Sequence, residues 1–170
     1  PYITDLQRTA AKFDAVITGS DQVWNPNATG GDFGYFLDFV GSGTKKIAYA
    51  ASIGYRTFPA KYESKCIEYL KGFESISVRE KSACKTVAES ADKDVENVLD
   101  PTLLLSDLRW LDIAKKPRNL PHRYILVYMM EGCKYTIEKA RALAKDKECD
   151  LVLINPTLRQ RQTCKDFVMY

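Results

Sequence analysis

The chain has 170 residues, of which 45% are hydrophobic and 28% are charged, and its formal net charge is +3. This composition is typical of a soluble globular protein, and the small net charge without a block of like charge argues against a nucleic-acid-binding protein. No apolar run is long enough to span a bilayer and no signal peptide is visible, so we expect a cytoplasmic protein.

The ends of the chain suggest a piece of something longer. Pro1 is not a natural initiator residue, and residues 166–170 read as the start of a strand that is cut off. The length suits one domain and part of another.

The first half of the chain predicts alternating strands and helices. An apolar strand over 13–18 ends in Gly-Ser-Asp, and a loop rich in glycine follows over 26–34. Further along we predict a short strand or sheet edge over 35–40 and a strand over 46–52. A helix over 59–71, a strand over 75–78 and a helix over 79–89 follow. In the helix over 59–71, Tyr62, Cys66, Tyr69 and Leu70 fall on one face.

A strand over 95–99 stops at Asp100-Pro101, and a short helix follows over 108–114. Residues 115–123 hold two prolines and no apolar periodicity, which is typical of a linker. After it, a strand (124–129), a helix (135–145) and a strand (151–154) form one βαβ unit.

This alternation predicts an α/β fold with parallel sheets. We predict a Rossmann-like domain over 1–115, a linker over 116–123, and the beginning of a second Rossmann-like domain over 124–170.

The five cysteines are scattered, and His122 is the only histidine. No Cys-x-x-Cys pair occurs, so we expect no zinc site. The count is odd and the helical cysteines fall on apolar faces, so we expect no disulfide among Cys66, Cys84, Cys133, Cys149 and Cys164. No glycine-rich nucleotide fingerprint or P-loop occurs either, which disfavours a dinucleotide or ATP site.

Polar residues follow each predicted strand of the first sheet. Because the carboxyl ends of parallel strands meet at one edge, we expect Ser20, Asp21, Arg79 and Asp100 to line one cleft there. Such a set of donors and acceptors suits a polar, hydroxyl-rich ligand. Some of these residues also have a simpler explanation, since Asp100 suits a turn and Arg79 could simply form an ion pair. Trp24, which follows the first strand, could be a core residue.

Several stretches, in this order, resemble the polysaccharide pyruvyl transferase family. The most specific are Gly-Ser-Asp-Gln-Val-Trp-Asn over 19–25 and Ser-Val-Arg-Glu over 77–80, and the others are 35–40, 46–52, 98–105 and 124–128. The resemblance implies two Rossmann-like domains arranged as in GT-B glycosyltransferases, with an acceptor-side domain first. It also implies transfer of the pyruvyl group of phosphoenolpyruvate to two hydroxyls of a sugar or lipid-linked oligosaccharide, without a cofactor.

The resemblance places substrate-binding residues in the stretches that it shares. These are Gly19, Ser20, Asp21, Gln22, Trp24, Asn25, Ser52, Arg79 and Glu80. Asp21 and Asp100 are the candidates to orient or deprotonate a hydroxyl, and Arg79 could face the pyruvyl carboxylate or tie the strand ends together.

The chain also departs from the family pattern. It lacks the apolar strand and glycine-rich turn with which members begin, and it has no His-Gly motif, so no catalytic histidine is assigned and the piece alone is expected to be inactive. Two alternatives stay open: a nucleotide-sugar glycosyltransferase of GT-B fold, and a non-catalytic glycan-binding module. The sequence names neither the sugar nor the oligomeric state.

Overall fold

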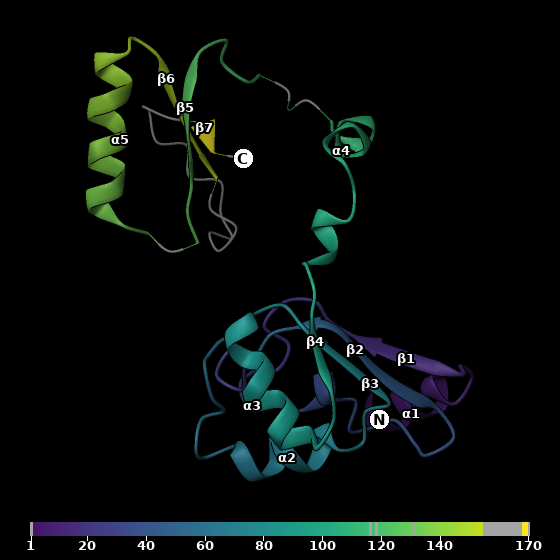
Figure 1. Cartoon of the computed structure of the whole chain (residues 1–170). Helices are drawn as coiled ribbons and strands as arrows, with labels where there is room; N and C mark the ends of the chain where they lie inside the picture. The colour runs from purple at the N-terminus through teal and green to yellow at the C-terminus, as the bar shows by residue number, and fades with distance from the viewer. Residues whose placement is uncertain (1, 116, 118, 131, 155–167, 170) are drawn as a thin grey trace. The chain divides into compact units, whose positions relative to one another are not determined.

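The computed structural model describes residues 2–115, 117, 119–130, 132–154 and 168–169. Contacts between Cα atoms divide the chain into two compact units, Pro1–Ile113 and Ala114–Tyr170 (Figure 1).

The first unit is built on a four-stranded sheet in the order β1-β2-β3-β4, in which every neighbouring pair is parallel. The predicted parallel α/β sheet is therefore confirmed. Its elements are helix α1 (Tyr2–Ala10), β1 (Ala15–Thr18), β2 (Lys45–Ala51), α2 (Glu63–Leu70), β3 (Ser75–Val78), α3 (Lys81–Ala91) and β4 (Val95–Asn97), followed by α4 (Asp107–Ile113).

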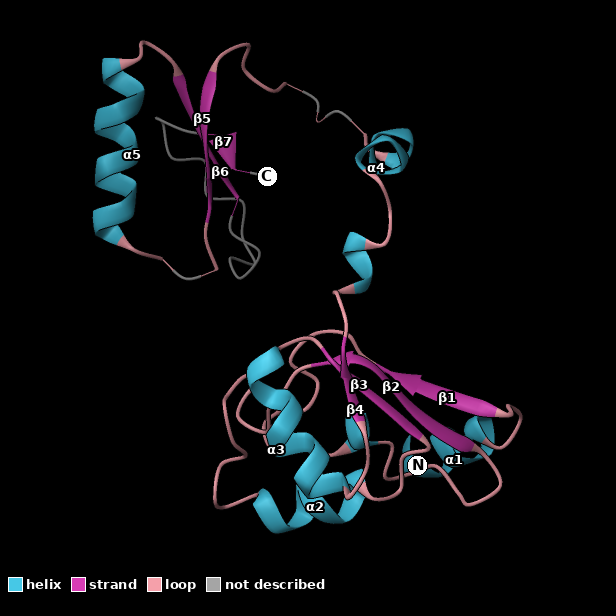
Figure 2. Cartoon of the chain, in the orientation of Figure 1, coloured by secondary structure: helices cyan, strands magenta, loops and turns pink. Residues whose placement is uncertain are grey.

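Helices α2 and α3 lie on the same side of this sheet (Figure 2). The apolar face predicted for α2 is confirmed, because Cys66 and Leu70 are buried and Tyr62 and Tyr69 pack against the same core. Helix α3 contributes Ala83, Val87 and Ala91 to that core. Helix α2 connects β2 to β3, and α3 connects β3 to β4. Burial of their apolar faces holds both helices against the sheet.

The prediction of a strand or sheet edge over 35–40 was wrong. Residues Gly34–Phe36 form a 3-10 helix, and Leu37 has a left-handed φ of 55°. Turn hydrogen bonds run from Leu37 N to Gly34 O and from Val40 N to Leu37 O. Phe36, Leu37 and Val40 are buried, so the apolar residues signalled burial, whereas a run this short does not specify its backbone shape.

Strand β2 contains a bulge beside its carboxyl end. Ala48 pairs with Ile76 and Ala51 with Val78, so two residues of β2 face Ser77 alone, and Ala50 has a φ of 50°. The Ser77 hydroxyl spans the bulge: it accepts from Ala50 N at 3.1 Å and donates to Ala48 O at 3.2 Å. Bulges of this kind redirect backbone groups at the end of a strand.

The second unit contains β5 (Tyr124–Tyr128), α5 (Lys134–Asp146), β6 (Asp150–Ile154) and β7 (Val168–Met169). Its three strands run parallel in the order β5-β6-β7. Ala140 and Ala144 of α5 pack with Leu151, so the predicted strand, helix and strand form a βαβ unit with a core of its own.

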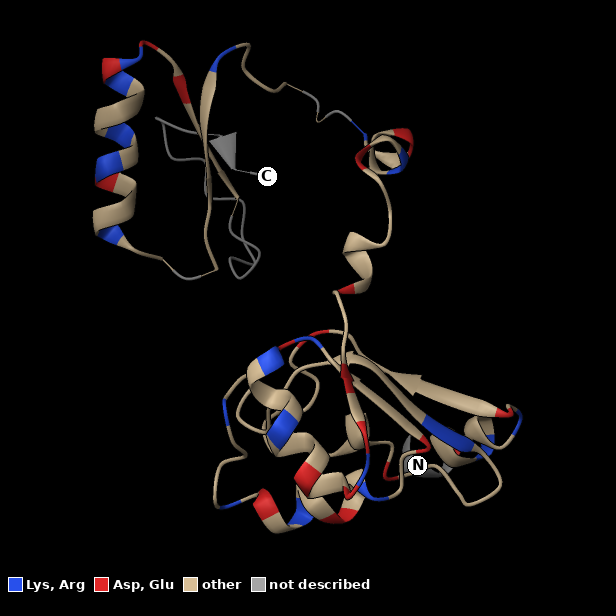
Figure 3. Ribbon diagram, in the orientation of Figure 1, with Lys and Arg blue, Asp and Glu red and all other residues tan. Residues whose placement is uncertain are grey.

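Within the described residues no helix is long and apolar enough to cross a membrane. Helices α3 and α5 each carry acidic as well as basic residues (Figure 3). Cys66, Cys84, Cys133 and Cys149 are free thiols, as predicted, while Cys164 lies outside the described residues.

Candidate functional site

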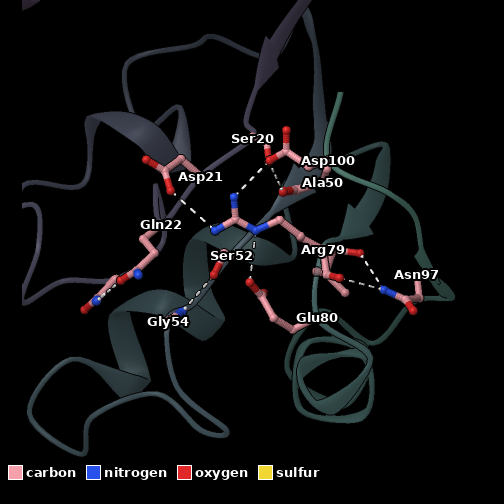
Figure 4. Close-up of polar contacts among 12 residues, drawn as sticks. Ser20, Asp21, Gln22, Ala50, Ser52, Gly54, Arg79, Glu80, Asn97 and Asp100 are labelled. Atoms are coloured by element: carbon pink, nitrogen blue, oxygen red, sulfur yellow. Dashed lines mark hydrogen bonds and ion pairs between the residues drawn. The ribbon is translucent and has the colours of Figure 1, made fainter. Parts of the chain in front are cut away.

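Arg79 is the centre of a polar cluster at the carboxyl edge of the first sheet. It follows β3, and its guanidinium lies between the side chains of Asp21, Glu80 and Asp100 (Figure 4). Nη1 is 2.9 Å from Asp100 Oδ2, Nε is 3.1 Å from Glu80 Oε1, and Nη2 is 3.3 Å from Asp21 Oδ1. The segments that follow β1, β3 and β4 therefore meet at one guanidinium, which brings Ser20, Asp21, Arg79 and Asp100 together. The cleft that the sequence predicts there stays a prediction.

Asp100 is fully committed to hydrogen bonds. Oδ1 accepts from the backbone N–H of Thr102 at 3.0 Å and from its hydroxyl at 2.7 Å. Oδ2 accepts from Arg79 and lies 2.8 Å from Ser20 Oγ. These bonds, led by those from Thr102, hold the pKa of Asp100 far below its ordinary range. Asp100 is thus a fixed anion whose acceptor positions are occupied.

Asp21 differs from Asp100 in almost every respect. Its side chain is 85% exposed, and it makes one long contact, to Arg79. Among the described residues, its second carboxylate oxygen, Oδ2, has no hydrogen-bond partner. Of the two candidate carboxylates, Asp21 is therefore the one that can accept a hydrogen bond from a ligand.

The turn that carries Asp21 is held by backbone hydrogen bonds to the residue that follows β2. The backbone N–H of Ser52 donates to Asp21 O at 3.0 Å, and that of Trp24 donates to Ser52 O at 3.1 Å. Gly19 has a φ of 115°, and a Cβ there would overlap the Tyr49 carbonyl oxygen, so the turn can cross β2 only with glycine. Ser20 Oγ also lies 2.8 Å from Ala50 O, a carbonyl within the bulge.

Three of the predicted substrate-binding side chains are enclosed by protein. Trp24 has no exposed surface, stacks on Phe36 at 5.4 Å between ring centroids, and donates from Nε1 to Tyr35 O. Ser52 is also fully buried, and its hydroxyl accepts from Gly54 N. Asn25 is 6% exposed. In this conformation these three residues shape the turn and do not face a ligand.

Gln22 is intermediate between the exposed Asp21 and the enclosed side chains. Its side chain is on the exposed side of the turn, where Oε1 accepts from Asn25 Nδ2 at 2.7 Å. Gly54, with a φ of 69°, lies under this amide pair, and a Cβ on it would come within 2.6 Å of both side chains. Gln22 is therefore held in place by a buried neighbour.

The sequence did not identify the residues that support the cluster. Thr102 supplies two of the bonds to Asp100, and Asn97 Nδ2 donates to the carbonyl oxygens of Val78 and Arg79. Asp-Pro-Thr is a readable capping pattern, because an aspartate often accepts from the residue two positions on. Nothing in the sequence around Asn97 or Ser77 signals their roles.

The cluster includes one strained feature. Within the described part of the chain, Glu80 Oε2 is enclosed without a hydrogen-bond partner, although Oε1 is bonded to Arg79. An enclosed carboxylate oxygen without a donor costs folding free energy.

No group of histidine, cysteine or acidic residues with the geometry of a metal site occurs among the described residues.

The family signature of this chain extends well beyond the cluster. The sequence profile of the polysaccharide pyruvyl transferase family matches residues 2–156, which include every residue of the Arg79 cluster. The chain belongs to the polysaccharide pyruvyl transferase family. No curated protein and no solved structure gives a significant match. Membership of this pyruvyl transferase family confirms the resemblance and indicates a transferase acting on a polysaccharide or its precursor.

Proposed function

We propose that this pyruvyl transferase moves the pyruvyl group of phosphoenolpyruvate onto two hydroxyls of a sugar, forming a ketal and releasing phosphate. The observation that carries the proposal is the family match over residues 2–156, which contains the Arg79 cluster. The proposal includes a GT-B-like enzyme, since both units have all-parallel sheets.

The reaction sets three chemical demands. A general acid must protonate the methylene carbon of phosphoenolpyruvate, which becomes the methyl group of the ketal. Two sugar oxygens then bond to the former enol carbon, whose bond to the phosphate oxygen breaks. One hydroxyl proton balances the proton used on the methylene carbon, and the other leaves with phosphate. A base must therefore receive hydroxyl protons, and positive charge must stabilise the phosphate.

Asp21 best meets the demand for a hydroxyl acceptor. Its free Oδ2 is exposed at the edge of the sheet, while Oδ1 stays near Arg79 Nη2 at 3.3 Å. In this role Asp21 orients one acceptor hydroxyl and accepts its proton as the bond to carbon forms. Asp100 acts as a positioning residue, because it fixes Arg79 and Ser20 and has no free acceptor.

The proposal is tested by offering the natural protein that contains these residues phosphoenolpyruvate, a nucleotide sugar and a glycan. Release of phosphate from phosphoenolpyruvate only when a glycan is present, with a mass gain of a pyruvyl ketal on the glycan, is the expected result. Turnover of a nucleotide sugar would instead establish a glycosyltransferase. Binding of glycan with no effect of either donor would establish a binding module.

A further inference from the structure

The charges around Arg79 do not balance. One guanidinium meets the carboxylates of Asp21, Glu80 and Asp100 at 3.3, 3.1 and 2.9 Å, so the four side chains carry a formal charge of −2. An arginine has five N–H donors, and three of them point at these carboxylates. Arg79 is therefore occupied by the chain's own anions.

The neighbouring helix also begins beside a carboxylate. The N-terminus of a helix attracts anions through its free N–H groups. At the start of α3, however, the N-cap residue is Glu80, whose Oε2 is enclosed without a partner. At this edge the guanidinium already faces carboxylates, and the first turn of α3 lies next to the negative charge of Glu80, although that side chain makes no cap hydrogen bond.

A hydroxyl-bearing ligand fits where an anion does not. A hydroxyl both donates and accepts, so it can donate to the free Oδ2 of Asp21 and accept from the remaining N–H on Arg79 Nη2. A carboxylate only accepts, and a carboxylate or a phosphate would each meet a net negative field. Ser20, whose oxygen lies 2.8 Å from both Asp100 and Ala50 O, is held by the same contacts.

We propose that the Arg79 cluster receives an uncharged part of the acceptor and selects against acidic sugars, with Asp21 and Glu80 as the specificity-determining residues. The inference rests on the proposed function and deepens it by naming the charge class of the acceptor at this site. It also assigns the phosphate and carboxylate of the donor to other groups than Arg79.

The test measures binding by the whole chain, labelled with ¹⁵N, to three probes: methyl glucoside, methyl glucuronide and inorganic phosphate. The first two share a ring and differ in a hydroxymethyl against a carboxylate. The amides of Ser20 and Asp21 and the Nε–H of Arg79 report contact with the cluster. We expect methyl glucoside to shift these signals and to bind at least about tenfold more tightly than either anion, as like-charge repulsion at short range requires.

A pair of variants on one helix separates local charge from overall charge. Glu80→Gln removes one negative charge from the cluster, so the preference for glucoside over glucuronide should fall by about threefold or more. Glu89→Gln changes the overall charge equally, but Glu89 is exposed and pairs only weakly with Lys85 at 3.8 Å. The preference of the Glu89→Gln variant should match that of the wild type.

The outcomes are decisive in each case. Binding of glucuronide or phosphate as tight as that of glucoside, or an equal effect of both variants, overturns the inference. The absence of any shift with all three probes also overturns it, because the cluster then receives no sugar. None of these results bears on phosphate release from phosphoenolpyruvate, so the proposed function stands or fails by its own assay.

Discussion

The chain segments that follow β1 and β4 both bring an aspartate to Arg79, and they hold it in opposite ways. After β1, the backbone of the turn is tied to β2 through Ser52, while the Asp21 side chain is left 85% exposed. After β4, the Asp100 side chain takes bonds from Thr102, Arg79 and Ser20, while the leucines that follow are exposed. The segment after β1 leaves its carboxylate exposed, whereas the segment after β4 holds its carboxylate in hydrogen bonds.

This difference separates two roles within one cluster. A carboxylate with every acceptor position filled can position its neighbours but cannot take a new proton donor. A carboxylate with a free oxygen on a rigid turn can meet a ligand at a defined place. Two aspartates that look equivalent in the sequence are therefore a positioning residue and a candidate catalytic residue.

The two tryptophans give the largest expected contrast between these segments. Trp24→Ala should lower the free energy of unfolding by about 3–5 kcal/mol, because the buried ring packs against Phe36 and Phe73. Trp110→Ala is the matched control, since Trp110 is 41% exposed and should cost much less. Chemical denaturation of the chain measures both, and equal losses would show that the turn after β1 is not anchored in the core.

A smaller effect is expected at Asp100, and it should depend on pH. The pKa of Asp100 is lowered in the folded state, so its stabilising contribution is present above the unfolded pKa of about 3.9 and is lost as pH falls toward the folded value. Asp100→Asn should therefore lower Tm near neutral pH, and the difference from wild type should shrink below about pH 4.

Asp112→Asn is the control for that experiment, because Asp112 is exposed and lies 3.8 Å from Arg109. A Tm difference for Asp100→Asn that does not change with pH would contradict the assignment of Asp100 as a fixed anion.

The bulge of β2 predicts a further, modest loss. Ser77→Ala removes the hydroxyl that bonds Ala50 N and Ala48 O, and should cost about 1 kcal/mol. Ser75→Ala tests the same strand at an exposed position and should be close to neutral. A neutral Ser77→Ala would mean that the bulge is stabilised without this side chain.

The smallest effect is expected in the exposed segment after β4. Leu104 is 64% exposed, so Leu104→Ser should change the free energy of unfolding of this chain by no more than about 0.5 kcal/mol. A loss comparable to that of Trp24→Ala would show that this leucine is packed in solution.

Much of the first sheet was predictable because its strands are short apolar runs that end in turn residues. Ser75–Val78 was predicted to the residue, and the meeting of strand ends follows from parallel topology alone. The 3-10 helix over Gly34–Phe36 was not predictable, since its apolar residues suit a buried strand equally well.

Within the site, the sequence gathered the right residue types but could not rank them. Thr102, a near neighbour in the chain, bonds one oxygen of Asp100, and the distant residues Ser20 and Arg79 contact the other. Asp21 has only its long contact with Arg79. Burial of Trp24 and Ser52 likewise depends on packing that no local pattern encodes. Local chemistry therefore locates the site, while long-range contacts decide which side chains face out.

The central claim is that Asp21 is the carboxylate that meets the acceptor. Its most direct test is the turnover of phosphoenolpyruvate and glycan by the Asp21→Asn variant of the natural protein, with Tm measured on the same sample. We predict a fall in kcat of about a hundredfold or more, with Tm unchanged, because asparagine keeps the size of the side chain and removes the base. Wild-type turnover with an unchanged Tm would contradict the claim and leave Asp21 as a turn residue.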